Sequence, residues 1–368
     1  MSKAYETVLE IDLNALKHNY TYLKTKLKKD TKVLGVVKAF AYGSDANAIA
    51  KVLQDLEVDY FAVAYVNEGV ALRDAGIRTP ILVLHPQPIN FKLMIERCLE
   101  PSIYSHRILK QFIETATSEQ QQNYPVHIKF NTGLNRLGFI STDLDSIVDQ
   151  LQQTSALKVK SVFSHLAASE DLKEMAFTLK QIDTFKTIAN RFTEMMGYKP
   201  LLHILNTSGI INYPEAQFDM VRTGIGLYGY GNSEAETKML KPVASLKSVI
   251  SQIHSIGAQE SVGYNRAFTA SSPQKTATIP IGHADGIGRP YGNGKGFVCI
   301  NGERAPIVGN VCMDMIMVNV TTIDCAEGDE VIIFGTDSNA SVLATQANTI
   351  SYELLTAISQ RVRRVFLT

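Results

Sequence analysis

The sequence has few cysteines, no net charge and no long apolar run, and each shortage excludes a class of protein. Its 368 residues contain four cysteines and no C-x-x-C pair, so we expect neither a disulfide framework nor a zinc site or other metal. The 36 Lys and Arg residues balance 36 Asp and Glu residues, which disfavours nucleic acid as a partner. The N-terminus lacks an apolar signal core, and no apolar run reaches membrane-spanning length. We therefore expect a cytoplasmic protein with no membrane partner.

Apolar strand-like runs alternate with helical periodicity through the first part of the chain. The predicted strands lie at residues 32–39, 60–66, 80–85, 101–104, 125–130, 159–165, 201–205 and 218–222. The predicted helices lie at residues 13–28, 45–56, 67–76, 89–98, 106–118, 143–153, 175–196 and 208–212. Strands separated by helices pair in parallel, and eight such units favour an α/β protein with a TIM-type (β/α)8 barrel. A doubly wound sheet is disfavoured, because no G-x-G-x-x-G turn follows the first of these strands.

The spacing of apolar residues changes near residue 240, where long helical periodicity ends. Short alternating runs appear at residues 244–250, 276–281, 296–300, 315–320 and 330–334, and a helix is predicted at residues 344–359. This pattern indicates a mostly-β second domain. Residues 231–241 lack apolar periodicity and are the predicted linker. We therefore divide the chain into a barrel domain, residues 1–235, and a mostly-β C-terminal domain, residues 236–368.

Lys38 is the first candidate for a functional side chain. It lies near the end of an apolar, β-branched run that begins at Val33. Lysine is rarely buried unless it is paired or used chemically. The alternative is a strand-edge lysine whose amine reaches water, and this stretch alone does not decide between the two.

Two neighbouring strand ends are rich in hydroxyl groups and glycine. Active sites of (β/α)8 barrels lie at the C-terminal ends of the strands, and phosphate is often bound after strands seven and eight. The hydroxyls of Thr207 and Ser208 and the backbone amides of Gly224 and Ile225 could form such a cradle. Each motif alone is better explained as a helix cap or a turn, but together on adjacent strands they favour phosphate.

A phosphate site opposite a lysine suggests pyridoxal 5′-phosphate, whose aldehyde reacts with lysine amines. Arg222, at the end of the eighth strand, could meet the ring nitrogen. Because arginine does not give up its proton, it would donate to an unprotonated nitrogen and weaken the cofactor as an electron sink. Such a site suits proton exchange at Cα better than decarboxylation or transamination. His165 could stack on the ring, bond to Arg222, or be a satisfied core histidine.

An ordered set of motifs resembles those of the bacterial alanine racemase family over the whole chain. The motifs lie at residues 37–43, 129–138, 165, 206–209, 221–229, 262–265, 284–286, 309–314 and 352–355. The resemblance implies a barrel with a β-rich C-terminal domain, pyridoxal 5′-phosphate as cofactor, and interconversion of L- and D-alanine that supplies D-alanine for peptidoglycan. It also implies a homodimer in which each active site takes residues from both chains.

The resemblance further implies two catalytic bases. Lys38 would hold the cofactor and act on one face of the substrate, and Tyr264 from the partner would act on the other, as racemisation by proton exchange requires. A phenol with a pKa near 10 is a poor base, and a chain Tyr264–His165–Arg222 would stabilise its ionised form. Taken alone, Tyr264 would be interpreted as a half-buried strand aromatic.

The remaining assignments also come from the resemblance. The hydroxyls of Tyr42, Thr207 and Tyr352 would bind phosphate with the amides of Gly224 and Ile225. Arg136 would meet the cofactor's phenolic oxygen and the substrate carboxylate. Lys129 matches a lysine that the family carbamylates to steady that arginine. The backbone amide of Met313, contributed by the partner and followed by Asp314, would contact the substrate carboxylate.

Some positions depart from the family pattern. Phe40 replaces Asn, Ser44–Asp45 replaces His-Gly, Asn131 and Asn319 each replace Asp, and His283 stands where an entrance tyrosine is common. None removes a proposed catalytic group. The changed entrance leaves open a racemase for serine or another small amino acid. A non-catalytic pyridoxal-phosphate carrier is disfavoured, because such carriers resemble only the barrel and lack a domain with Tyr264.

Overall fold

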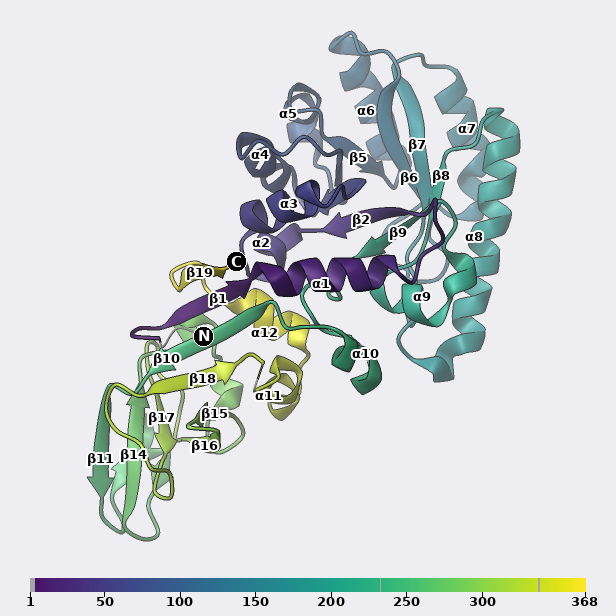
Figure 1. Cartoon of the computed structure of the whole chain (residues 1–368). Coiled ribbons are helices and arrows are strands. Elements are labelled where there is room, and N and C mark those ends of the chain that lie inside the picture. The colour runs from purple at the N-terminus through teal and green to yellow at the C-terminus, as the bar shows by residue number, and fades with distance from the viewer. Residues whose placement is uncertain (1–3, 232, 337) are drawn as a thin grey trace.

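The computed structural model describes residues 4–231, 233–336 and 338–368, and Figure 1 shows a barrel joined to a β-rich domain. Eight parallel strands form the barrel sheet in the order β8-β7-β6-β5-β4-β3-β2-β9. They are β2 (Lys32–Val36), β3 (Tyr60–Val63), β4 (Ile81–Val83), β5 (Glu100–Ile103), β6 (Tyr124–Lys129), β7 (Leu157–Phe163), β8 (Leu201–His203) and β9 (Met220–Thr223). Backbone hydrogen bonds from Asp219 to Leu202 (3.1 Å) and from Arg222 to Leu205 (3.0 Å) close the sheet between β8 and β9. The predicted barrel is confirmed.

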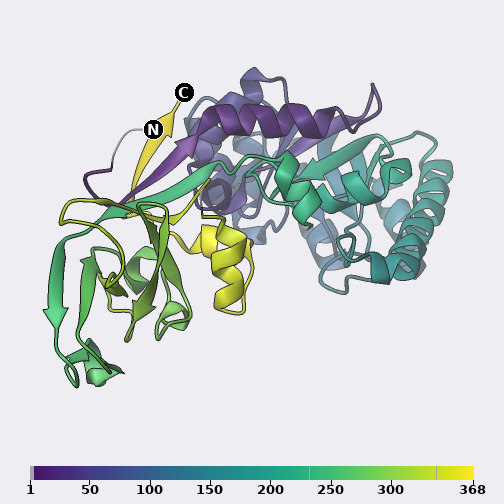
Figure 2. The same ribbon diagram turned by 60° about the horizontal axis from the view of Figure 1, so that its bottom comes forward.

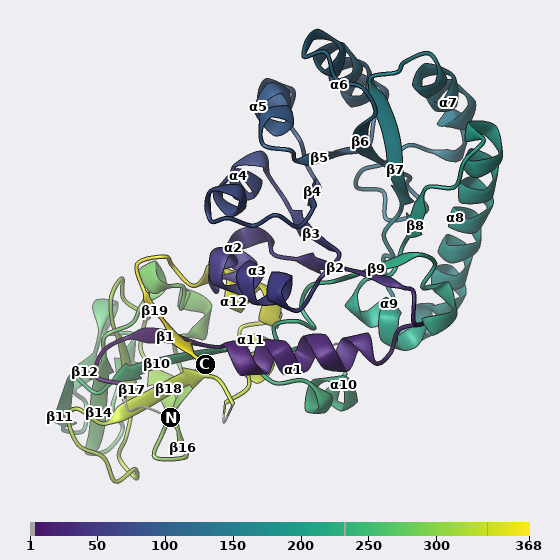
Figure 3. The same cartoon turned by 45° about the horizontal axis from the view of Figure 1, so that its top comes forward.

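Helices surround the sheet, as Figure 3 shows. They are α1 (Leu13–Lys24), α3 (Ala46–Asp55), α4 (Val66–Asp74), α5 (Phe91–Glu96), α6 (His106–Ser118), α7 (Leu144–Gln152), α8 (Met175–Met196) and α9 (Thr207–Asn212). The helix α6 shows why they form: Ser105 caps it by accepting from the Ile108 amide, and Ile108 and Phe112 lie on its buried face. The predicted bounds of α6 and α8 are confirmed. None of the helices among the described residues is long and apolar enough to span a membrane.

The first barrel strand is shorter than predicted. The strand β2 ends at Val36, and Lys38–Tyr42 form the short helical turn α2. Four consecutive residues of this turn, Ala39 to Tyr42, have φ between 52° and 55°. This left-handed conformation costs L-residues roughly 1–2 kcal/mol each. Lys38 therefore begins a strained turn and does not lie on the strand itself.

The C-terminal domain is built on a nine-stranded sheet in the order β11-β14-β17-β16-β15-β18-β10-β1-β19. Its strands are β1 (Val8–Asp12), β10 (Ala244–Val249), β11 (Gln252–Ile256), β14 (Gln274–Ile279), β15 (Phe297–Ile300), β16 (Glu303–Val308), β17 (Ile316–Asn319), β18 (Glu330–Phe334) and β19 (Arg363–Leu367). A separate hairpin consists of β12 (Ser261–Val262) and β13 (Phe268–Thr269). The strand β1 pairs antiparallel with β10 and parallel with β19, so both ends of the chain meet in this sheet (Figure 2).

One prediction for this domain was wrong in detail. The helix predicted at residues 344–359 is two helices, α11 (Ala340–Gln346) and α12 (Ser351–Ala357). Asn348, with φ of 56°, lies in the break between them. The predicted linker contains the short helix α10 (Glu234–Met239), whereas residue 232 of that linker lies outside the described residues.

Candidate active site

A cavity of about 880 Å³ opens at the C-terminal ends of the barrel strands. Most of the sequence-predicted site residues line it: Lys38, Tyr42, Lys129, Arg136, His165, Thr207, Arg222, Gly224, Ile225 and Tyr352. They come from the α2 turn, from β6 and β9, from loops after β6, β7 and β9, and from α9 and α12. The fold thus brings together side chains that lie more than three hundred positions apart along the chain, from 38 to 352.

Lys38 is half-buried at the start of the α2 turn. Burial lowers the pKa of its amine, the Arg136 cation lowers it further, and the Glu68 carboxylate opposes both. A lower pKa increases the share of neutral amine, which is the nucleophilic form. Glu68 also holds the turn, because it accepts hydrogen bonds from the amides of Ala39 (2.6 Å) and Ala64 (2.7 Å).

Tyr42 and Thr207 form one wall of the cavity with the backbone after β9. The Tyr42 ring stacks on Tyr228, with ring centroids 4.5 Å apart. Thr207 Oγ1 accepts from the amides of Gly224 (3.3 Å) and Gly226 (3.4 Å). A Cβ at Gly224 would come closer than 3.0 Å to Tyr42 Oη, so the close approach of the phenol to the backbone requires glycine there. Ser208 is buried beside Thr207 in α9.

Two phenols in this wall stay protonated. Burial raises the pKa of Tyr42, and burial together with the Glu170 carboxylate raises that of Tyr352 to about 12. The two rings lie 5.9 Å apart. Both hydroxyls can therefore donate hydrogen bonds to an anion. A cradle of hydroxyls around a glycine is the chemistry that a phosphate group needs, so these residues fit a phosphorylated cofactor.

Arg222 is buried and makes hydrogen bonds with both of its terminal nitrogens. Its Nη2 donates to His165 Nδ1 (3.0 Å) and to the carbonyl of Ser164 (2.7 Å), and its Nη1 donates to His203 Nδ1 (2.7 Å). Burial and the Arg222 charge hold the pKa of His165 well below its usual range. Because arginine only donates, His165 Nδ1 must accept and its Nε2 carries the hydrogen. Of the possibilities left open for His165, the structure shows the bond to Arg222.

Positive charge accumulates around the cavity. Lys129 is buried, and burial followed by the charges of Arg136, Arg222 and Lys38 lowers its pKa to about 8. Arg136 is exposed in the loop after β6. Such a concentration of cations favours anionic ligands.

The other predicted site residues lie apart from this cavity. Tyr264, Met313 and Asp314 line a separate cavity of about 510 Å³ in the C-terminal domain. The Tyr264 side chain is 74% exposed and that of Met313 is 58% exposed. The interpretation of Tyr264 as a half-buried strand aromatic was wrong, since it begins a 3-10 turn (Tyr264–Arg266). Within one chain, the fold does not bring Tyr264 or Met313 to Lys38.

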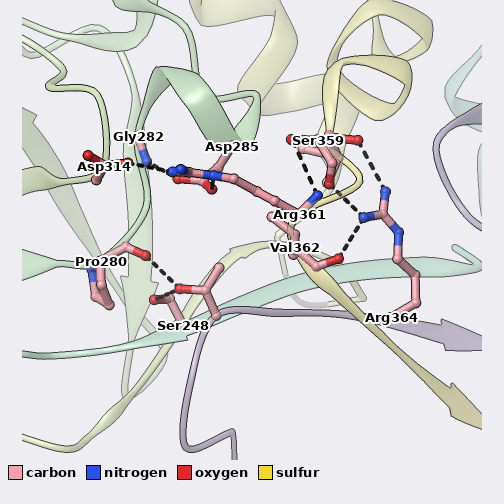
Figure 4. A network of polar contacts seen from close by, with 11 residues as sticks. Ser248, Pro280, Gly282, Asp285, Asp314, Ser359, Arg361, Val362 and Arg364 are labelled. Atoms are coloured by element: carbon pink, nitrogen blue, oxygen red, sulfur yellow. Dashed lines mark hydrogen bonds and ion pairs between the residues drawn. The ribbon is translucent and has the colours of Figure 1, made fainter.

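Figure 4 shows the polar contacts that Arg361 makes with Asp285 and with Asp314, the residue after Met313. The Ala284 amide donates to the Met313 carbonyl (3.0 Å). Arg361 donates to Asp285 (2.7 Å) and to Asp314 (2.6 Å) and so joins two loops. The neighbouring Arg364 donates to the carbonyls of Ser359 and Val362 (each 2.6 Å).

Several residues that shape the site were not singled out from the sequence. Arg364 also donates to the carbonyl of Gly43 (2.8 Å), which ends the Lys38 turn, and His203 supports Arg222. Glu68 had a local signal, because it lies three residues after the helix N-cap Tyr65 and bonds to the Tyr65 amide (3.0 Å). Arg364 had no such signal for its bond to the turn, since Gly43 lies far from it in sequence.

Comparison with known proteins identifies the family. Residues 11–232 match the family model "Alanine racemase, N-terminal domain", and residues 243–366 match "Alanine racemase, C-terminal domain". The chain is 36% identical over 366 residues to the alanine racemase of Thermodesulfovibrio yellowstonii, with 97% of each chain covered.

Solved structures agree. The alanine racemase of Clostridium difficile 630 superposes with a TM-score of 0.92 at 34% identity, covering 100% of this chain and 97% of that one. The alanine racemase of Bartonella henselae, described with covalently bound pyridoxal phosphate, superposes with a TM-score of 0.90 at 29% identity, covering 99% and 100%. Both halves of the chain match the two halves of these enzymes, and the chain belongs to the alanine racemase family.

Proposed function

We propose that the chain binds pyridoxal 5′-phosphate in the barrel cavity and interconverts L- and D-alanine. The observation that carries the proposal is a single cavity with a half-buried lysine, a hydroxyl-lined glycine cradle and a buried arginine. These features match the aldehyde, the phosphate and the ring nitrogen of the cofactor. The Bartonella henselae relative, which is described with this cofactor bound, supports the same conclusion.

When bound, the cofactor would withdraw electrons from the substrate Cα and so acidify its hydrogen. Tyr42, Thr207, Ser208 and Tyr352 would hold the phosphate with the backbone amides of Gly224 and Ile225. Arg222 would donate to the ring nitrogen without protonating it. Lys38 would hold the cofactor by its amine and move a proton at one face of Cα, which the lowered pKa of this amine favours.

The opposite face needs a second base, and we assign it to Tyr264 of a second copy of the chain. The phenol of Tyr264 is exposed and separate from the cavity of its own chain, as a residue that serves a neighbour would be. His165, with hydrogen on Nε2, could donate to an ionised phenol. A homodimer with shared active sites follows from this assignment.

The substrate carboxylate would meet Arg136 and the backbone amide of Met313 from the second copy. The Arg361–Asp314 ion pair would keep the Met313 loop in place. The pKa of about 8 at Lys129 leaves a share of neutral amine, which is the form that reacts with carbon dioxide, so carbamylation of Lys129 is chemically accessible. A cytoplasmic location, a role in supplying D-alanine for peptidoglycan, and the division between residues 235 and 236 remain proposals.

The visible spectrum of the purified protein, before and after addition of L- or D-alanine, tests the function. We expect a cofactor absorbance band that changes with either enantiomer, and chiral chromatography should show both enantiomers at equilibrium. A protein that binds the cofactor but never forms the other enantiomer would favour the carrier hypothesis. Parallel turnover assays with L-serine and L-lysine test the second candidate function, a racemase for serine or another small amino acid. The exposed His283 beside the Met313 loop keeps this candidate open.

A further inference from the structure

A chain of hydrogen bonds crosses the barrel interior from Arg222 to Glu100. His203 Nε2 lies 2.9 Å from Ser161 Oγ, in addition to its contact with Arg222. Ser161 Oγ lies 2.6 Å from His127 Nδ1, and His127 Nε2 lies 2.7 Å from Glu100 Oε2. These five residues lie on β9, β8, β7, β6 and β5 in turn, which are successive strands around the barrel.

With neutral imidazoles, the two ends of this hydrogen-bonded series fix the direction of every hydrogen bond in it. Arginine can only donate and a carboxylate can only accept. His203 Nδ1 therefore accepts, which leaves the hydrogen on Nε2 to be donated to Ser161. The Ser161 hydroxyl is then free to donate only to His127 Nδ1, so the His127 hydrogen is on Nε2 and points to Glu100. A neutral imidazole at each position then has a single tautomer.

The residues of this hydrogen-bonded series are buried, which makes the charge of Arg222 costly unless it is compensated. Ser161, His127 and His203 are fully buried, and Arg222 is almost so. A buried charge is costly unless it is paired or well hydrogen-bonded, yet Arg222 forms no ion pair within the described part of the chain. The hydrogen-bonded chain links it to the Glu100 carboxylate, which lines a cavity of about 770 Å³ beside Lys32 and Tyr60 at the N-terminal ends of the strands.

Packing against Phe163 restricts the side chains at one end of this series of hydrogen bonds. The His203 ring stacks on Phe163 with centroids 4.8 Å apart and planes inclined by 2°. The Arg222 guanidinium lies over the same ring at 5.4 Å. Hydrogen bonds in such a chain polarise one another in a low-dielectric interior, so a change at one end is felt at the other.

We propose that Glu100, His127, Ser161 and His203 are positioning residues that orient Arg222 in the active-site cavity and offset its charge with a remote carboxylate. They would set how strongly Arg222 donates to the ring nitrogen, although none of them lines the cavity. The proposal rests on the proposed function, because it assumes that Arg222 meets the cofactor ring.

Neutron diffraction from deuterated crystals of the wild-type holoenzyme tests the hydrogen-bond directions without any substitution. We expect deuterium on Nε2 and none on Nδ1 of both His203 and His127. Deuterium on Nδ1 of either ring would break the deduced sequence of donors and acceptors and overturn the proposal.

A double-mutant cycle tests the coupling. Ser161→Ala interrupts the series of hydrogen bonds without changing charge, and Glu100→Gln removes the carboxylate charge at nearly constant volume. Each should lower kcat for alanine by about 10-fold, with KM changed less than about 2-fold, and the double variant should lose about 10-fold rather than 100-fold. Each should also shift the ¹⁵N resonance of the ring nitrogen in bound ¹⁵N-labelled cofactor.

Ser102→Ala is the matched control, because Ser102 is a buried serine opposite His127 on β5 whose hydroxyl has no partner among the described residues. It should leave kcat and the ¹⁵N resonance unchanged. The proposal would be overturned if the losses in kcat were additive, or if the Ser161→Ala protein matched Ser102→Ala in kcat and in the ¹⁵N resonance. Failure of the wild type to bind cofactor or to racemise alanine would instead refute the proposed function, and the two failures are thereby distinguished.

Discussion

The approach of Tyr42 to Gly224 makes Gly224→Ala the sharpest test of the phosphate cradle. The added methyl group would lie closer than 3.0 Å to Tyr42 Oη and 3.1 Å from its Cζ. Tyr42 cannot move away easily, since it is buried and packed on Tyr228 and Tyr352. Overpacking a dense interior costs about 1–3 kcal/mol. We expect Gly224→Ala to lower the free energy of unfolding by that amount and to weaken cofactor binding about 10- to 100-fold.

A second variant separates the steric effect from the loss of the cradle. The nearest atom to the new methyl group is the Tyr42 hydroxyl oxygen, so Tyr42→Phe in the Gly224→Ala background should recover most of the lost stability. It should not recover cofactor affinity, because it also removes a hydroxyl donor. Urea unfolding of the apoprotein measures the first quantity, and titration with pyridoxal 5′-phosphate measures the second.

Gly257→Ala is the matched control, because a Cβ at this glycine meets nothing closer than 3.6 Å. It should change stability by less than about 0.5 kcal/mol and leave cofactor affinity unaltered. If Gly224→Ala bound the cofactor as tightly as Gly257→Ala does, the phosphate would lie elsewhere and the cradle assignment would be refuted.

Three further predictions concern the bases and the buried lysine. Lys38→Ala should abolish the visible absorbance of the bound cofactor, and absorbance that borohydride fixes onto another lysine would contradict its role. Tyr264→Phe should bind cofactor normally but exchange the Cα proton of only one alanine enantiomer with deuterated solvent, and mixing it with Lys38→Ala should restore partial activity after subunit exchange; no recovery would argue against shared sites. Burial and neighbouring cations lower the pKa of Lys129 from 10.5 to about 8, so between these pH values the folded protein binds fewer protons at this residue than the unfolded protein does. In buffer free of carbon dioxide, the stability of the wild type should therefore rise relative to that of Lys129→Met from pH 8 to pH 10. Parallel pH profiles of stability for the two proteins would refute the shift.

Much of the barrel could be predicted because its elements are specified locally. The helix α6 has a serine cap and a buried apolar stripe, and α8 ends at Gly197 in the left-handed conformation, so their bounds followed from sequence. The break at Asn348 was missed, because the apolar spacing continues across it and α11 and α12 each cover only seven residues.

The site residues at strand ends could be predicted from the sequence. Those whose conformation or placement depends on tertiary contacts could not. Lys38 and Arg222 stood out as charges near the ends of predicted buried strands. The Lys38 turn did not, because Ala, Phe, Ala and Tyr all disfavour positive φ. Tyr264 could not be placed either, since its role depends on a surface that one chain leaves exposed. The series of hydrogen bonds from Arg222 to Glu100 needs the register of five neighbouring strands, which no local pattern contains.

The Lys38 turn shows how the two parts of the chain depend on each other. Its left-handed backbone is unfavourable in isolation, so its neighbours must hold it in place. Glu68, on the barrel helix α4, binds its start at Ala39, and Arg364, on β19 of the C-terminal sheet, binds its end at Gly43. The carbonyl of Leu355 in α12 lies so close to Gly43 that a side chain there would overlap it. Lys38, which lines the cavity, is therefore positioned by both domains at once, and a barrel without its β-rich partner would lose the restraint at one end of the turn.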